Sequence, residues 1–96
     1  MLKDSFKAMA NPARLNILAL LSKAEKNSNR EPLAKQGELS VHRILDGVSL
    51  SPSTISHHLN VLKKAGLVKA RKDKQWVYYS LNRGTIDEMK DYLARL

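Results

Sequence analysis

The sequence contains no cysteine, which excludes disulfides, thiolate metal sites and thiol-based redox sensing. It also has no long apolar stretch: the longest uninterrupted run, residues 17–21, is far too short to span a membrane. The N-terminus lacks the charged and then apolar pattern of a signal peptide. We therefore expect a cytoplasmic protein.

Residue patterns for catalysis and for metal binding are also missing. There is no glycine-rich phosphate loop, no useful pair of carboxylates, and no base and acid spaced to activate the serines of residues 51–56. We therefore predict that the protein is not an enzyme and that it needs no cofactor. The three histidines do not form a ligand set, because the neighbours His57 and His58 point about 100° apart on a helix. We expect His42 at the surface and His58 partly buried and hydrogen-bonded.

Acidic residues are outnumbered, and the excess of positive charge is the main feature of the composition. Seventeen Lys and Arg against nine Asp and Glu give a net charge of +8 over 96 residues, with a pI of about 10.0. Such a balance favours a polyanionic partner, nucleic acid first and an anionic membrane second. Six of these cations face only Asp73 within residues 63–74. The length indicates one domain, 1–96, with a modest core.

Residues 50–66 have the pattern of a capped helix with two different faces. Ser51 is a good N-cap, Pro52 suits the first helical position, and Gly66 suits the C-terminal end. Ile55, Leu59 and Leu62 form one apolar stripe. The opposite face carries short polar groups and no carboxylate, as expected of a helix that lies in the major groove of DNA. An ordinary amphipathic helix with a solvated polar face is the alternative.

The preceding chain reads as three more helices. The first covers about 2–10, and the second, about 12–24, begins at an Asn11-Pro12 cap and buries Leu15, Ile17, Leu18 and Leu21. Residues 25–37 read as a flexible, solvated connection, in which Leu33-Ala34 at most forms one helical turn. Ser40 caps the third helix and Gly47 ends it. Two short helices joined by a tight turn have the spacing of a helix-turn-helix.

After Gly66 the pattern changes to that of strands. Residues 67–71 and 76–81 flank Lys72-Asp73-Lys74-Gln75, which predicts a β-hairpin with a basic tip and with Val77, Tyr79 and Leu81 toward the core. Thr85 is expected to cap a last helix, about 85–96. The predicted fold is mostly α with a small β-hairpin, in the order α-α-α-α-β-β-α: a winged helix-turn-helix with the wing at about 67–81 and the recognition helix at about 52–65.

Four stretches together resemble one family. FKAMANPARLNILALL (6–21), GELSVHRIL (37–45), LSPSTISHHLNVLKKAGLV (50–68) and RKDKQWVYYSL (71–81) are similar to the ArsR/SmtB family of winged-helix repressors. The resemblance implies a homodimer paired through the first and last helices, here about 2–10 and 85–96, that occupies operators and leaves DNA when an inducer binds. The interface residues it implies are Leu2, Phe6, Met9, Ile86, Met89, Leu93 and Leu96.

The departures from that family concern sensing and readout. ELSVHRI stands where metal-sensing members carry cysteines, and the last helix has carboxylates but no histidine. We therefore expect no metal site and leave the identity, and even the existence, of a small-molecule inducer open. Pro52 follows the capping serine where the family usually has glutamine, which removes one expected base contact.

We thus predict a DNA-binding transcriptional regulator, a homodimeric repressor of a palindromic operator. The alternatives are a winged-helix module that binds an acidic protein, or an RNA-binding winged helix that stacks bases on Trp76, Tyr78 and Tyr79. The expected DNA-contacting residues are Ser53, Thr54, Ser56, His57 and Asn60 at base edges and Lys63, Lys64, Arg71, Lys72 and Lys74 at phosphates.

Overall fold

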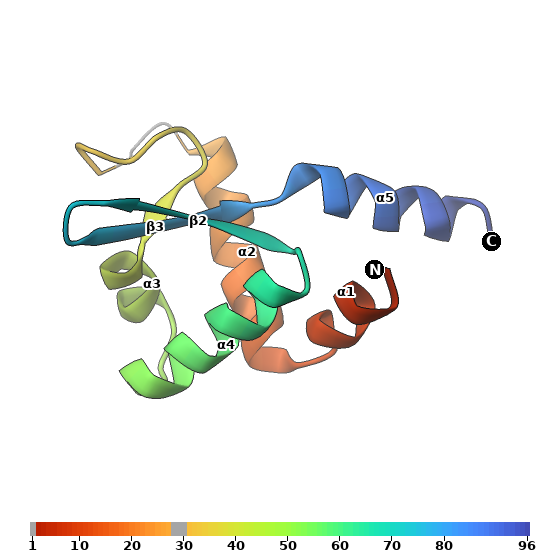
Figure 1. Cartoon of the computed structure of the whole chain (residues 1–96), viewed down its shortest axis with the longest axis horizontal. Coiled ribbons are helices and arrows are strands. Elements are labelled where there is room, and N and C mark those ends of the chain that lie inside the picture. The colour runs from red at the N-terminus through yellow and green to blue at the C-terminus, as the bar shows by residue number, and fades with distance from the viewer. Residues whose placement is uncertain (1, 28–30) are drawn as a thin grey trace.

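A computed structural model describes residues 2–27 and 31–96, and Figure 1 shows how their elements are arranged. The helices are α1 (Leu2–Met9), α2 (Pro12–Lys26), α3 (Val41–Gly47), α4 (Pro52–Lys64) and α5 (Arg83–Ala94). The strands are β1 (Leu39–Ser40), β2 (Val68–Asp73) and β3 (Trp76–Leu81). The predicted class, mostly α with a β-hairpin, is confirmed. The predicted order lacked β1, which is too short to leave a pattern in the sequence.

The ends of the helices follow local chemistry. The side chains of Asn11, Ser40 and Ser51 accept hydrogen bonds from backbone N–H groups three residues on, and so cap α2, α3 and α4 as predicted. At the end of α4, Gly66 has a φ of +78°, and the Leu67 N–H donates to the Leu62 carbonyl at 3.0 Å. This is a Schellman end, which turns the chain directly into β2.

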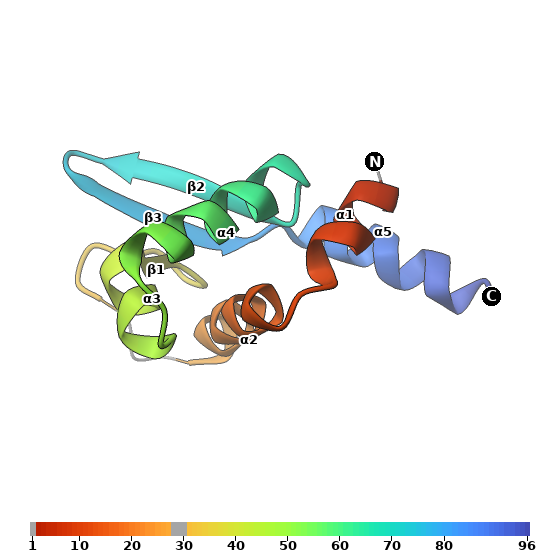
Figure 2. The ribbon, with the colours of Figure 1, turned by 90° about the horizontal axis from the view of Figure 1, so that it is seen from below.

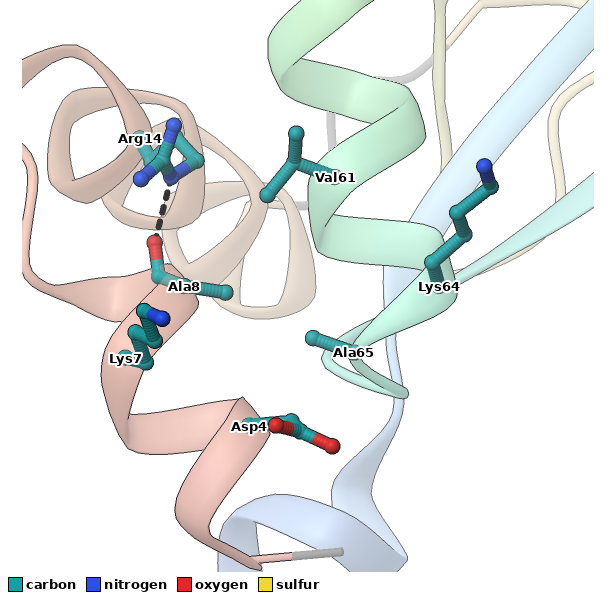
Figure 3. Close-up of a pocket in the computed structure, with 7 residues that line it drawn as sticks. All are labelled: Asp4, Lys7, Ala8, Arg14, Val61, Lys64 and Ala65. Carbon is teal, nitrogen blue, oxygen red and sulfur yellow. Dashed lines mark hydrogen bonds between the residues drawn. The ribbon is translucent and has the colours of Figure 1, made fainter.

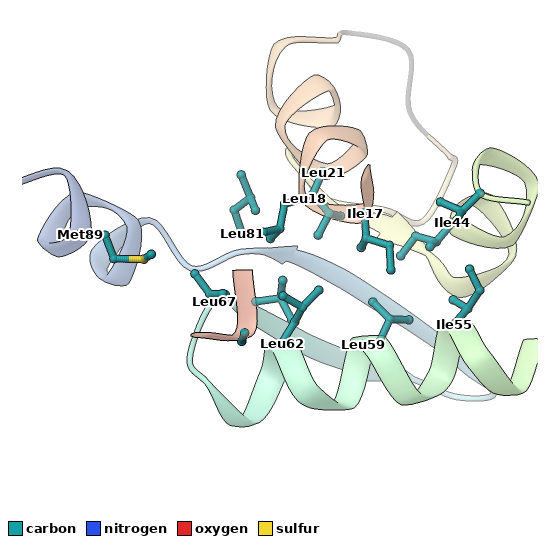
Figure 4. Close-up of a cluster of buried hydrophobic side chains, with 13 residues drawn as sticks. Ile17, Leu18, Leu21, Ile44, Ile55, Leu59, Leu62, Leu67, Leu81 and Met89 are labelled. Atoms are coloured by element: carbon teal, nitrogen blue, oxygen red, sulfur yellow. The ribbon is translucent and has the colours of Figure 1, made fainter. Parts of the chain in front are cut away.

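The core lies where α2 and α4 pack against the sheet (Figure 4). Ile17 and Leu21 of α2 are fully buried, and Ile55 and Leu62 of α4 are buried with them. Leu15 was predicted in this core, but it is 47% exposed. The prediction for Leu15 was therefore wrong, because of the two leucines three residues apart only Leu18 is buried.

The three strands form one antiparallel sheet in the order β1-β3-β2. Leu39 pairs with Tyr79 on one side of β3, and Ala70 pairs with Tyr79 on the other. Leu81 is buried as predicted, and Tyr79 packs against the core from a half-buried position. The most buried residue of β3 is Tyr78, at 3% exposure, although it points to the opposite face. The hairpin is therefore covered on both faces at this strand, whereas the sequence pattern predicted core contacts only for Val77, Tyr79 and Leu81.

The second face is covered by the segment before β1, which had been read as a solvated connection. Ala34 and Glu38 are buried, and the Glu31 carboxylate accepts a hydrogen bond from the Ser40 N–H at 2.8 Å. Glu25, at the end of α2, pairs with Arg83 of α5. The part of the predicted loop that spans residues 28–30 lies outside the described residues. Residues 31–38 are a structural part of the fold rather than a solvated connection.

The terminal helices α1 and α5 pack on each other within one chain, as the ring contact of Phe6 with Tyr92 shows. α5 begins at Arg83, after an Asn82 that makes no side-chain cap, so the predicted cap at Thr85 is wrong. Met89, one of the predicted interface residues, is only 4% exposed in the single chain. The apolar side chains that remain open at this end of the chain are Leu93 of α5 and Leu96 just after it, 56% and 88% exposed, and the outer part of Tyr92, which is 44% exposed beside Phe6.

Candidate nucleic-acid interface

The helix-turn-helix consists of α3, the turn of residues 48–51 and α4. Seen from below in Figure 2, α4 lies in front of the sheet along one side of the molecule, with α3 at one end and α1 at the other. Its inner stripe is held by the core and by the Ser51 and Gly66 ends, which fixes the rotation of the helix about its axis. The opposite face of α4 therefore points outward with its side chains free of the core.

This outer face is polar and exposed. Ser53, Ser56, His57, Asn60, Lys63 and Lys64 are all exposed. Thr54 differs, because it is half-buried and its hydroxyl lies 2.8 Å from the Ser51 hydroxyl, within the cap itself. No acidic residue occurs anywhere between Asp46 and Asp73. The arrangement offers hydrogen-bonding groups and positive charge with no carboxylate to repel a phosphate.

His58 is buried and hydrogen-bonded, as predicted, and it is held against α2 rather than toward this face. It is 9% exposed, and its Nδ1 lies 3.2 Å from a guanidinium nitrogen of Arg14. Because a guanidinium can only donate, Nδ1 must accept and His58 must be neutral, with its proton on Nε2. Burial lowers the pKa of His58, and the charge of Arg14 lowers it further. His58 thus anchors α4 to α2, whereas the neighbouring His57 is exposed.

The hairpin turns at Lys74 and Gln75, between the paired residues Asp73 and Trp76. Lys72 and Lys74 are exposed there. Lys74 has a φ of +58°, the left-handed conformation that normally favours glycine or asparagine. A two-residue hairpin turn favours a positive φ at its first residue, so the backbone of Lys74 follows from the geometry of the turn.

Arg71 occupies a different environment from these lysines. Its Nε and Nη2 donate to the two carboxylate oxygens of Glu38 at 2.8 and 2.7 Å, and Nη2 also donates to the Leu33 carbonyl. The guanidinium lies 4.8 Å from the centre of the Tyr78 ring. The hydrogen bond from Arg71 lowers the pKa of Glu38, and the same bond raises the pKa of Arg71. This two-point contact fixes β2 to the segment before β1, and it argues against the phosphate contact expected for Arg71.

Several other candidates are settled by their surroundings. Tyr78 is too buried to stack on a base, and the Trp76 ring packs edge-on against His42 at 5.0 Å between centroids, which counts against the RNA-binding alternative. His42 itself is exposed, as expected. Among residues 2–27 and 31–96, no three His, Asp or Glu side chains gather in a way that would hold a metal ion. No helix in these ranges has the length and apolar character needed to cross a membrane.

Sequence reasoning missed two groups of residues at this interface. Glu38, the partner of Arg71, carried no signal because 33 residues separate the two. A cleft beside α4 joins charged residues of α1 and α2 to Lys64, and of these residues only Lys64 had been singled out. The only indication of this cleft in the sequence was that Asp4 and Lys7, three residues apart and of opposite charge, lie on one side of α1.

A helix-turn-helix followed by a basic antiparallel hairpin defines a winged helix-turn-helix, a class of DNA-binding proteins. Comparison with known proteins gives the family. The model described as "Bacterial regulatory protein, arsR family" matches residues 32–70, and this chain belongs to that family of DNA-binding transcriptional regulators. The predictions of a regulator and of a protein that is not an enzyme are thereby confirmed.

Relatives match over most of their lengths. An HTH-type transcriptional regulator of Methanocaldococcus jannaschii is 42% identical over 90% of this chain and 83% of its own. The transcriptional repressor SdpR of Bacillus subtilis is 30% identical, with 96% and 88% covered. The transcriptional activator HlyU of Vibrio cholerae is 38% identical, with 94% and 71% covered. The relatives therefore include one protein named as a repressor and one named as an activator.

A solved structure supports the same assignment. The homodimeric winged helix-turn-helix DNA-binding domain of a possible ArsR-family regulator from Mycobacterium bovis superimposes with a TM-score of 0.70 at 28% identity. The match covers 96% of this chain and 74% of that one. Its title gives the fold and the homodimer for that protein.

Proposed function

We propose that this chain is a cytoplasmic homodimeric repressor that binds a palindromic operator and that residues 1–96 act as one DNA-binding domain. In each subunit α4 enters the major groove and the hairpin contacts the backbone beside it. The observation that carries the proposal is the outer face of α4, where short polar groups are exposed and acidic groups are absent. The repressor SdpR and the Mycobacterium bovis homodimer are consistent with this assignment.

The roles of the side chains follow from their exposure and chemistry. His57 and Asn60 read base edges, since both are exposed and lie on the outer face of α4. Ser53 and Ser56 lie on the same face and support this contact. Thr54 contributes less to readout, because its hydroxyl belongs to the helix cap. These assignments divide base reading from charge neutralisation.

The phosphate contacts come from four lysines rather than from five cations. Lys63 and Lys64 end α4, and Lys72 and Lys74 surround the hairpin turn. All four are exposed. We remove Arg71 from this group and assign it to positioning the wing through Glu38.

The dimer forms through the open face of α5, with α1 beneath it. Tyr92, Leu93 and Leu96 provide the apolar contact. Leu2, Phe6, Met9 and Ile86 are already half-buried against the core of their own chain, so their part is to support the terminal helices from below. We assign Met89, which is 4% exposed in the single chain, the same supporting role.

The experiment is a binding titration against DNA from the region upstream of the gene and against a scrambled duplex of the same composition. We expect His57→Ala and Asn60→Ala to lose discrimination at one base pair each, by roughly 1–3 kcal/mol. Lys3→Ala, on the exposed side of α1, is the control and should leave the affinity for both duplexes unchanged. Equal binding of wild type to both duplexes would contradict the proposal, and increased transcription on binding would show an activator instead.

A further inference from the structure

A cleft of about 380 Å³ opens between α1, α2 and the C-terminal half of α4 (Figure 3). This volume lies within the range of roughly 300–1,000 Å³ that is common for small-molecule sites. Arg14, Lys7 and Ala8 form one wall and Val61, Lys64 and Ala65 the other, with Asp4 at one end between them. The cleft therefore combines three cations, one carboxylate and an apolar surface.

The walls of the cleft are fixed by hydrogen bonds. The Ser5 hydroxyl donates to the Ala65 carbonyl at 2.7 Å, which joins α1 to the end of α4. The Nε of Arg14 donates to the Ala8 carbonyl, and another nitrogen of its guanidinium contacts His58. The cleft is thus formed without a ligand, and a bound molecule would not need to order it.

The charges of the cleft are available to a ligand. Within the described ranges, Asp4, Lys7 and Lys64 form no ion pair with one another or with any other residue, although they surround one cleft. Arg14 uses only part of its guanidinium, because two of its five N–H groups serve the Ala8 carbonyl and His58. A ligand that carries a negative and a positive group would satisfy both kinds of charge.

We infer that the cleft binds a free α-amino acid with an apolar side chain and that this ligand releases the protein from DNA. The carboxylate contacts Lys7 and Arg14, the ammonium group contacts Asp4, and the side chain lies on Ala8, Val61 and Ala65. Lys64, whose ammonium group points away from the cleft in Figure 3, turns toward the bound carboxylate. A DNA phosphate fits less well, since Asp4 would repel it and the apolar wall would have no partner. This inference rests on the proposed function, because Lys64 serves both the cleft and the DNA backbone.

The coupling follows from that shared residue. An amino-acid carboxylate that pairs with Lys64 competes with the phosphate for the same ammonium group. The ligand and DNA must then weaken each other's binding by the same factor. We expect at least a threefold loss of operator affinity at saturating ligand, and a smaller salt dependence of the remaining binding.

The first test uses the full chain labelled with ¹⁵N and titrated with each of the twenty L-amino acids up to 10 mM, with no DNA present. We expect an apolar member to shift the amide signals of Ala8 and Ala65 saturably. Lys7→Gln and Asp4→Asn should each weaken this binding at least tenfold. Lys3→Gln, one turn away on the same helix but outside the cleft, is the matched control and should bind as wild type does.

Three results would overturn the inference while leaving the proposed function standing. The first is normal operator binding by a protein whose Ala8 and Ala65 signals respond to none of the twenty amino acids. The second is a ligand that binds the cleft but leaves operator affinity unchanged. The third is a Lys7→Gln variant that weakens binding to all duplexes and lowers the salt slope, which would assign the cleft to a DNA phosphate. Failure of the unliganded protein to prefer its operator would instead contradict the proposed function.

Discussion

Salt dependence separates the two kinds of cation on the hairpin. Lys72→Ala removes an exposed ammonium group that we assign to a phosphate, whereas Arg71→Ala removes a guanidinium already held by Glu38. A single phosphate contact contributes about 0.9 to the slope of log K against log salt concentration. Because a dimer carries each substitution twice, Lys72→Ala should lower the slope by about 1.8. Arg71→Ala should leave it close to that of wild type.

The size of this effect is large enough to measure. Between 50 and 200 mM salt, a change of 1.8 in the slope alters the loss of affinity by about 12-fold. Fluorescence anisotropy with a labelled operator and with scrambled DNA gives both curves for each variant. Lys72→Ala should lower the affinity for the two duplexes by the same factor, because a phosphate contact carries no sequence information.

Arg71→Ala should lower the thermal stability of the protein rather than the salt slope of DNA binding. Glu38, 8% exposed, would lose the partner that lowers its pKa, so the variant should unfold at lower temperature than Lys72→Ala does. Affinity should be compared at a temperature where both variants are folded. If Arg71→Ala lowered the slope as much as Lys72→Ala and unfolded like wild type, the structural role given to Arg71 would be refuted.

Three further predictions concern assembly and stability. In sedimentation at micromolar concentration, Leu93→Asp should convert the dimer to a monomer. Leu15→Asp, at a similarly exposed leucine of α2, is the control and should remain dimeric. A monomeric wild type would contradict the proposed interface. Gly66→Ala should cost about 1–2 kcal/mol in urea unfolding because φ is +78°, whereas Gly84→Ala in α5 should stabilise by up to about 1 kcal/mol. The pKa of Glu38 is lowered on folding, so its contribution is complete above the ordinary value of 4.5 and is lost as the pH falls through the lower folded value. Glu38→Gln should therefore flatten the fall in melting temperature below pH 4.5, and an unchanged profile would refute that assignment.

The parts of the fold that the sequence predicted depend on neighbouring residues. The Ser51 cap, the apolar stripe of α4 and the Gly66 end each involve groups within a few positions of one another. Their geometry is therefore decided by local hydrogen bonding and helical periodicity. The same reasoning placed His58, whose position on the helix fixes the side toward which it points.

The parts that could not be predicted depend on distant pairing. β3 became the central strand only because β1 joined its free edge, and the segment before β1 then buried Tyr78. Alternation along β3 cannot indicate this, since a strand covered on both faces has no polar side. Likewise, Arg71 and Lys72 are adjacent cations in the sequence, and only the fold distinguishes them by bringing Glu38 to one of them.

The division between these cations follows the chemistry of their side chains. Arg14, Arg71 and Arg83 each hold another part of the chain through two or more hydrogen bonds: Ala8 and His58, Glu38 and Leu33, and Glu25. A planar guanidinium suits such fixed contacts, whereas the flexible ammonium group of lysine suits a phosphate whose position varies with the duplex. In the described part of the chain, Lys63, Lys64, Lys72 and Lys74 form no ion pair and remain free for DNA. The net charge of +8 therefore overstates the charge that meets the duplex, and the salt slope should follow these lysines rather than the total.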